Sequence, residues 1–179
     1  NAGKRPPGDA DARVRPVGTS SETRLRKHVK PAWFDYYAPR DLDEALHILG
    51  DAGQDGRVLA GGQSLMPMLN LRILNPAVVV DINRIESLNR LHAGPDGLTV
   101  GALVRHADLL RSPDVRAEWP LLWEATTQVA HMAIRNRGTV CGSVSHNEPS
   151  AEHPSVLVTM DCTVVVQGLA GRRELPAEV

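Results

Sequence analysis

Two short apolar segments, separated by a glycine pair and a helical segment, are the feature that most constrains how this chain folds. Residues 57–60 and 77–80 both have the composition of buried strands, and the second is a continuous run of Ala and Val. Between them, Gly61 and Gly62 precede a segment at 64–71 that has the pattern of a helix. A strand, a helix and a second strand in this order predict a right-handed βαβ unit with parallel strands.

The segments on the N-terminal side extend this unit to a lobe at residues 31–85. The aromatic cluster at 33–37 predicts an extended segment. Asp41, with Glu44 three residues later, predicts a capped helix start, and Gly50 or Gly53 can end that helix.

The second half of the chain has hairpin signals instead of crossovers. Turn sequences occur at 94–97 and 168–171, and each is flanked by two short segments that can pair as strands. The predicted hairpin strands are 88–91 with 98–103, and 162–166 with 172–175. The predicted helices are 106–111, 118–129 and 150–160. The fold class is therefore α+β with two lobes: the parallel βαβ lobe at 31–85 and an antiparallel-sheet lobe with helices at 86–179.

Charge is unevenly distributed along the chain. Residues 1–30 hold eight Lys and Arg against three Asp and Glu and have few strongly apolar side chains, so we expect a disordered basic tail there. A targeting peptide is the alternative. The lack of an apolar segment and the presence of acidic residues argue against it.

The overall composition excludes several classes of protein. With 42% hydrophobic residues, 23% charged residues and a net charge of −1, the chain is not disordered as a whole and has no global attraction to nucleic acid or anionic lipid. No apolar run reaches the roughly 18–20 residues that a membrane span needs. Cys141 and Cys162 do not form a disulfide framework, so the expected location is the reducing cytoplasm, although the count also allows a single bridge.

The glycine pair at the end of the first strand is the first candidate site. Gly61 and Gly62 lack a Cβ, so their backbone can approach a ligand closely and can adopt positive φ. The N-terminus of the following helix directs free N–H groups outward, which predicts an anion site. The segment is neither the dinucleotide fingerprint nor a P-loop, and a plain strand-to-helix turn is the alternative interpretation.

A second candidate site follows at residues 138–143, Gly-Thr-Val-Cys-Gly-Ser, with Glu148 and Glu152 close behind. Its N–H and O–H groups can donate to phosphate oxygens, and a nearby carboxylate can accept from ribose hydroxyls. The two segments together therefore predict a dinucleotide site. Arg135 and Arg137 add positive charge, although a solvated basic loop explains them equally well.

The residues of this region also allow two other kinds of site, a metal site and a nucleophilic cysteine. His146, Glu148, Glu152 and His153 form the best candidate metal cluster, but their spacing matches no known zinc pattern. Cys141 could instead be a nucleophile paired with His146 or His131. Trp119 and Trp123, four residues apart, are expected to be a packing pair.

The two candidate sites resemble the FAD motifs of a known family. Residues 58–67, Val-Leu-Ala-Gly-Gly-Gln-Ser-Leu-Met-Pro, are similar to the first FAD-binding loop in the flavoprotein (medium) subunits of molybdenum hydroxylases. That group contains the carbon monoxide dehydrogenase medium chain and the FAD domain of xanthine dehydrogenase. Residues 134–154 resemble its second FAD motif, and the resemblance spans about residues 30–176.

The resemblance implies an FAD-binding domain of the PCMH type, with the cofactor pyrophosphate on the backbone amides of residues 60–64 and Val140 near the flavin ring. The implied cofactor-binding residues are Leu59, Ala60, Gly61, Gly62, Gln63, Ser64, Leu65, Thr139, Val140, Cys141, Gly142, Ser143, Glu148 and Glu152. No residue of this chain is implied to be catalytic or to bind a metal.

The resemblance also implies partner subunits. A molybdopterin-binding large subunit would oxidise the substrate, and an iron–sulfur small subunit would pass electrons to the FAD of this chain for delivery to an external acceptor. This chain itself has two cysteines, whereas an iron–sulfur cluster usually takes four.

Two positions depart from the family pattern, because Cys141 stands where a glycine is usual and Glu148 stands where Asp is usual. A side chain at position 141 would cost about 1–2 kcal/mol if φ there is positive. The end at Val179 also suggests a C-terminally incomplete domain. These departures define an alternative function, a fragment that keeps the fold, binds FAD poorly and acts only as an interaction module. A third interpretation is a stand-alone FAD oxidoreductase.

Overall fold

The structure is a computed structural model that describes residues 30–177. The basic tail predicted at 1–30 lies outside the described residues, apart from Lys30. In chain order the elements are β1 (Asp35–Tyr37), α1 (Leu42–Ala52), η1 (Gly53–Asp55), β2 (Gly56–Leu59), α2 (Leu65–Asn70), β3 (Val78–Asp81), η2 (Glu86–Leu88), β4 (Leu91–Gly94), β5 (Gly97–Val100), α3 (His106–Arg111), α4 (Pro113–Glu118), α5 (Pro120–Gln128), α6 (Met132–Arg135), α7 (Val140–His146), α8 (Glu152–Thr159), β6 (Thr163–Gly168) and β7 (Gly171–Pro176).

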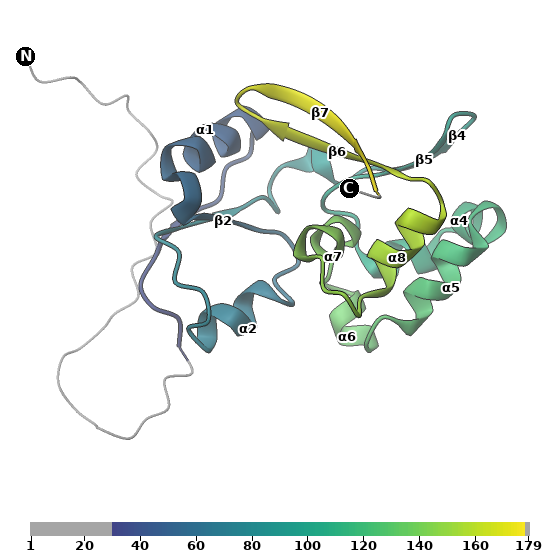
Figure 1. The fold of residues 1–179 in the computed structure, drawn as a ribbon, viewed down its shortest axis with the longest axis horizontal. Helices are drawn as coiled ribbons and strands as arrows, with labels where there is room; N and C mark the ends of the chain where they lie inside the picture. Colours follow the sequence, from purple (N-terminus) through teal and green to yellow (C-terminus); the bar gives the residue numbers. More distant parts are fainter. Residues whose placement is uncertain (1–29, 178–179) are drawn as a thin grey trace, which may run out of the picture.

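The first lobe is a three-stranded parallel sheet in the order β1-β3-β2. Val79 and Val80 of the central strand β3 are completely buried, as expected for a strand that is covered on both faces. Helices α1 and α2 lie on either side of β2 in Figure 1. The predicted strand–helix–strand unit with parallel strands is therefore confirmed as β2, α2 and β3.

Helix α1 begins and ends where its sequence indicates. The Asp41 carboxylate accepts hydrogen bonds from the backbone N–H groups of Asp43 (2.7 Å) and Glu44 (3.1 Å), which satisfies two amides that the first turn leaves free. Gly53 follows the last turn with φ of 54°, a conformation that favours glycine. Between these ends, Ala45 is buried in the core of the first lobe.

The second lobe contains both predicted hairpins, β4–β5 and β6–β7, each antiparallel. They form two separate two-stranded sheets. The strand predicted at 88–91 is displaced along the chain, because η2 occupies residues 86–88 and β4 runs from Leu91 to Gly94. Pairing nevertheless continues past the ends of the strands, since the Leu103 amide donates to the Leu88 carbonyl at 3.0 Å.

The single helix predicted at 118–129 is wrong, because the segment is divided between α4 and α5. Trp119 separates them with a non-helical backbone (φ −126°, ψ 58°). The cause is Pro120, which has no N–H and disfavours helical backbone in the residue before it. Trp119 and Trp123 both pack against the core of the second lobe, as predicted for a packing pair.

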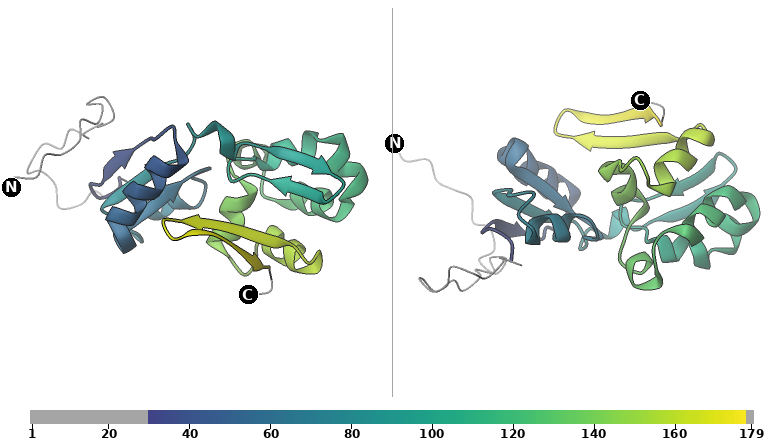
Figure 2. Two further views of the ribbon diagram at one scale, coloured as in Figure 1. Left: turned by 90° about the horizontal axis from the view of Figure 1, so that it is seen from above. Right: turned by 60° about the horizontal axis from the view of Figure 1, so that its bottom comes forward.

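The β6–β7 hairpin belongs to the second lobe but reaches across to α1 in the first (Figures 1 and 2). Leu169, at the tip of the hairpin, packs so closely on Gly50 of α1 that a Cβ at Gly50 would collide with the Leu169 Cδ1 atom. The hairpin therefore ties the end of the described chain to its first helix.

Among the helices of residues 30–177, none combines the length and the apolar character that crossing a bilayer requires.

Two buried histidines join α3 to α8 in the core of the second lobe. The rings of His106 and His153 are stacked, with centroids 4.8 Å apart and an interplanar angle of 16°. His153 Nε2 lies 3.2 Å from Thr126 Oγ1, whereas neither Nδ1 atom has a hydrogen-bond partner among residues 30–177. Burial, and then the neighbouring His153, lowers the pKa of His106 to about 4, and burial also lowers the pKa of His153.

These histidines predict acid sensitivity. The unfolded chain has histidine pKa values near 6.5, so between about pH 6.5 and pH 4 it binds more protons than the folded chain. The free energy of unfolding should therefore be highest above pH 6.5 and should fall as the pH drops to 4, with up to about 3 kcal/mol lost through His106 alone. Urea unfolding at a series of pH values measures this. His106→Phe should flatten the pH dependence, and an unchanged slope would contradict the assignment.

Candidate functional site

The two sequence motifs meet at the junction of the lobes. We call residues 59–65 the first motif and residues 138–143 the second motif. A Cβ on Gly61 would lie 2.6 Å from the Arg137 carbonyl oxygen and 2.7 Å from the Gly138 Cα atom. Side-chain carbons do not approach backbone atoms this closely, so the junction requires glycine at position 61.

A cavity of about 520 Å³ opens beside this contact. It is lined by parts of the first motif, by α2, by the end of β3 and by the segment before the second motif. The lining residues are Leu59, Ala60, Gly61, Gly62, Gln63, Met66, Pro67, Asn70, Asp81, Asn83, Ile134 and Arg137.

The first motif presents unused backbone donors to this cavity. The amide N–H groups of Gly61, Gly62, Gln63 and Ser64 donate to no acceptor within residues 30–177. Gly62 has φ of 72°, and this backbone reversal is favourable only for glycine. Consecutive free amides with the Arg137 side chain at the same cavity form a favourable environment for an anion. This geometry favours the anion-site interpretation over a plain turn.

Polar side chains at the end of β3 are satisfied within the protein. Asp81 accepts hydrogen bonds from the Tyr36 hydroxyl (2.5 Å) on one oxygen and from the Asn83 side chain (2.6 Å) on the other. Burial, followed by the bond to Asp81, raises the pKa of Tyr36 to about 12, so its hydroxyl stays a donor. Asn83 also donates to the Ala60 carbonyl at 2.9 Å, which anchors the first motif to β3.

The second motif is not a loop, because most of it is the first turn of α7. Thr139 precedes this helix, and its hydroxyl accepts from the Gly142 amide at 3.1 Å. The motif also pairs antiparallel with residues 104–106. The His106 amide donates to the Gly138 carbonyl (3.1 Å), and the Val140 amide donates to the Val104 carbonyl (3.2 Å). The glycines in the motif concealed a capped helix start from sequence-based prediction.

The side chains of the second motif divide into buried and half-exposed groups. Thr139 and Val140 are 2% and 3% exposed, so the Val140 side chain is part of the core rather than a surface for the flavin ring. Cys141 lies on α7 and is not among the residues with positive φ, so the backbone strain considered for this position does not arise. Gly142 and Ser143 follow on the same helix.

The Cys141 thiol donates to the Val100 carbonyl with a Sγ–O distance of 3.6 Å, and burial raises the pKa of the thiol. A nucleophilic cysteine needs the opposite shift, and neither His131 nor His146 is hydrogen-bonded to it among the described residues. Cys141 and Cys162 are both free thiols, so the structure contains no bridge between them.

Glu148 and Glu152 follow α7 in the chain and are not among the residues that line the cavity. Glu148 is exposed and accepts from the Ser150 hydroxyl at 3.4 Å, and Glu152 begins α8. His153 turns into the core, so the candidate metal set is dispersed, and no group of three potential metal ligands occurs within the described part of the chain.

Arg135 and Arg137 have different roles despite their proximity. The Arg135 guanidinium donates to the carbonyls of Thr127 (3.3 Å), Val129 (2.8 Å) and Ala130 (2.9 Å), and so caps the end of α5. The alternative interpretation, a solvated basic loop, therefore does not describe Arg135. Arg137, in contrast, lines the cavity.

Sequence reasoning did not select Asp81, Asn83, Met66, Pro67, Asn70 and Ile134 as site residues. A signal was available for the first two, because β2 and β3 are parallel and their carboxyl ends meet at one edge of the sheet. Residues that directly follow β3 therefore had to lie beside the first motif.

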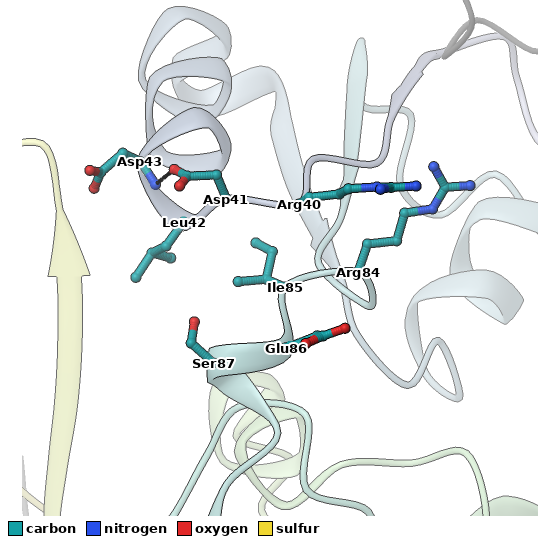
Figure 3. Close-up of a pocket in the computed structure, with 8 residues that line it drawn as sticks. All are labelled: Arg40, Asp41, Leu42, Asp43, Arg84, Ile85, Glu86 and Ser87. Carbon is teal, nitrogen blue, oxygen red and sulfur yellow. Dashed lines mark hydrogen bonds between the residues drawn. The ribbon is translucent and has the colours of Figure 1, made fainter.

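A second cavity, of about 450 Å³, lies between the start of α1 and residues 84–87 (Figure 3). Its lining combines arginines with acidic side chains, and the amides of Asp43 and Glu44 at the helix start are already bonded to Asp41. These two amides are therefore not available to a ligand.

Comparison with known proteins agrees with this geometry. Residues 32–179 match the family model described as the FAD binding domain in molybdopterin dehydrogenase, so the chain belongs to this family. One relative is the 6-hydroxypseudooxynicotine dehydrogenase complex subunit alpha of Paenarthrobacter nicotinovorans, which is 43% identical over 83% of this chain and 50% of its own length. The carbon monoxide dehydrogenase medium chain of Hydrogenophaga pseudoflava is 40% identical over 83% of this chain and 52% of its own.

Solved structures resemble the chain to a similar degree. Carbon monoxide dehydrogenase from Hydrogenophaga pseudoflava gives a TM-score of 0.80 over 83% of this chain and 52% of that chain, at 40% identity. Quinoline 2-oxidoreductase from Pseudomonas putida 86 gives 0.79 at 37% identity, over 83% of this chain and 52% of that chain. The chain spans about half the length of the curated relatives that it matches.

The contact at Gly61 predicts the effect of a single methyl group. Gly61→Ala should push the two motifs apart and lower the free energy of unfolding by about 1–3 kcal/mol, because the neighbouring atoms are backbone and cannot move aside cheaply. Urea unfolding of the chain without cofactor measures this. Gly168→Ala is the matched control, since a Cβ there meets nothing within 4 Å. Equal stability of the two variants would contradict the assigned contact.

The burial of the Cys141 thiol predicts that this residue is alkylated slowly. Because burial raises the pKa of Cys141, its alkylation by iodoacetamide at pH 8 should be at least tenfold slower than that of free cysteine. The measurement uses Cys162→Ser, so that one thiol remains. A rate equal to or above that of free cysteine would restore the nucleophile hypothesis.

Proposed function

We propose that this chain binds FAD at the junction of its two lobes and acts as the FAD-binding electron-transfer subunit of a molybdopterin-dependent hydroxylase or dehydrogenase. The observation that carries the proposal is the run of free amides from Gly61 to Ser64, because Gly61, Gly62 and Gln63 of this run line a cavity in a chain of the FAD-binding family. The chain would be an oxidoreductase subunit that is not catalytically complete alone.

The residues of the first motif fit the pyrophosphate of FAD. Backbone N–H groups donate to phosphate oxygens without side-chain entropy, and the Arg137 guanidinium supplies positive charge at the same cavity. Because Gly61 and Gly62 have no Cβ, the phosphate oxygens can approach their backbone closely. Leu59, Ala60 and Leu65 would support this segment from the strand and the helix on either side of it.

The second motif would hold the other side of the cofactor through its backbone and α7. Thr139 positions this helix by capping it, and Cys141, Gly142 and Ser143 are on its first turns. Glu148 and Glu152 are the carboxylates that could accept hydrogen bonds from the cofactor's hydroxyl or ring N–H groups. The side chain of Val140 is in the core, so only the backbone of this residue would contact the cofactor.

When bound, FAD supplies the redox chemistry, and the protein contributes binding, orientation and exclusion of water. No side chain of this chain is proposed to act as an acid or a base. Several relatives have names that identify them as subunits or medium chains. We therefore propose as partners a molybdopterin-binding large subunit and an iron–sulfur small subunit, with electrons passing from the clusters to FAD and then to an external acceptor in the cytoplasm.

The alternative of an interaction module with impaired FAD binding rested on Cys141, Glu148 and the position of Val179. The helical backbone at Cys141 removes the strain that motivated the first of these. FAD binding therefore remains the better-supported function, and the same feature predicts that Cys141→Gly binds FAD no better than the unchanged chain.

A titration of the chain with FAD tests the proposed function. We expect saturable binding of one FAD per chain, measured by flavin fluorescence. Gly62→Ala should weaken this binding about tenfold, because a residue with a Cβ costs about 1–2 kcal/mol at this positive φ. Gly168→Ala, whose φ is ordinary, serves as the control. If the unchanged chain takes up no FAD and Cys141→Gly does, the interaction-module alternative is correct.

A further inference from the structure

We propose that Arg105 and Asn83 are positioning residues for the flavin site, and that together they form a hydrogen-bonded strap that holds the first motif beside the second before the cofactor binds. This inference rests on the proposed function. It assigns roles to two residues outside both motifs, one from each lobe.

The strap is a continuous series of four groups. Asn83 Nδ2 donates to the Ala60 carbonyl at 2.9 Å. Arg105 then donates from one terminal nitrogen to Asn83 Oδ1 at 2.5 Å and from the other to the Arg137 carbonyl at 2.6 Å. The series therefore begins on the first motif and ends on the residue before the second motif.

No hydrogen bond joins residues 59–65 directly to residues 138–143 within the described part of the chain, so the strap connects them through Asn83 and Arg105. The contact at Gly61 limits how closely they can approach, but it provides no directional attraction. The strap is thus a directional attraction that opposes separation of the two motifs, whereas the contact at Gly61 limits how closely they approach. Hydrogen bonds from a charged guanidinium are among the stronger ones in proteins, because the donor carries a full charge.

Both residues are held in place by groups other than the motifs. The backbone amide and the side chain of Asn83 both donate to Asp81 Oδ1. The other carboxylate oxygen of Asp81 accepts a hydrogen bond from the Tyr36 hydroxyl. The Arg105 amide donates to Asp108 Oδ2 at 2.9 Å, which fixes its backbone at the start of α3. Each end of the strap is therefore anchored in its own lobe.

The strap also places two arginines close together beside the cavity. Both terminal nitrogens of Arg105 donate hydrogen bonds within the protein, one of them to the backbone carbonyl of Arg137, and Arg137 is one of the residues that line the cavity. Burial, and then the neighbouring Arg137, lowers the pKa of Arg105, which agrees with two guanidinium groups kept close together. An anion bound between the motifs would relieve that repulsion.

The test compares FAD affinity with stability in the same variants. Arg105→Met and Asn83→Leu should each weaken FAD binding ten- to hundredfold. The double variant should lose little more FAD affinity than the weaker-binding single variant, because either substitution alone already breaks the same series of hydrogen bonds. Arg105→Lys should also bind poorly, since an ammonium cannot reach two acceptors with the geometry of a guanidinium.

The matched controls are Arg111→Met and Asn75→Leu. Arg111 makes an exposed ion pair with Asp108 on α3, and Asn75 makes one exposed bond to the Arg72 carbonyl. FAD affinity should be unchanged in both. A purely structural role for the strap would lower the free energy of unfolding of the cofactor-free chain and leave FAD affinity within threefold of the original, and that result would overturn the proposal. Additive losses in the double variant would also overturn it.

Hydrogen exchange on the cofactor-free chain provides a readout that does not depend on flavin. The amides of residues 138–142 should exchange at least tenfold faster in Arg105→Met than in the unchanged chain and in Arg111→Met. Failure of the unchanged chain to bind FAD would contradict the proposed function. Unchanged exchange in Arg105→Met would contradict the strap itself, so the two failures are distinguishable.

Discussion

The close approach of Gly61 to the backbone at residues 137–138 is the constraint on which the site depends. It places the end of a parallel strand from one lobe against the segment that enters α7 in the other. Because the atoms in contact are all backbone, the separation of the lobes at this point is set by covalent geometry and by the absence of one methyl group. The cavity lies beside this contact, because Gly61 and Arg137 are both among the residues that line it.

Local signals were sufficient to predict the first lobe. The apolar run of β3, the Asp41 cap and the glycine pair each act over a few residues, and the parallel sheet follows from their order. The second motif was harder, because Gly138 and Gly142 suggested a loop, while the cap at Thr139 and the pairing with residues 104–106 make it a helix start. That pairing joins segments far apart in sequence, which no local pattern reveals.

The site also shows why the roles of charged residues are difficult to predict from sequence. Arg135 and Arg137 are two residues apart, yet one caps α5 and the other lines the cavity. Asp81 would be a natural ligand for a hydroxyl, but both of its oxygens are used by Tyr36 and Asn83. The side chains near the cavity mainly hold the backbone in place, and the backbone provides the donors. Recognition built in this way tolerates substitution of many side chains but few changes at the glycines.

The hairpin that packs on α1 has a consequence for the order in which the chain can complete its fold. Leu169 reaches Gly50 from the opposite end of the described chain, and a ribosome would release α1 long before it releases β6 and β7. During synthesis the first lobe can form its parallel sheet early, since β1, β2 and β3 are close in sequence. The contact between α1 and the hairpin tip can form only after β6 and β7 have emerged, so the two lobes are joined on this side after the parallel sheet can already have formed.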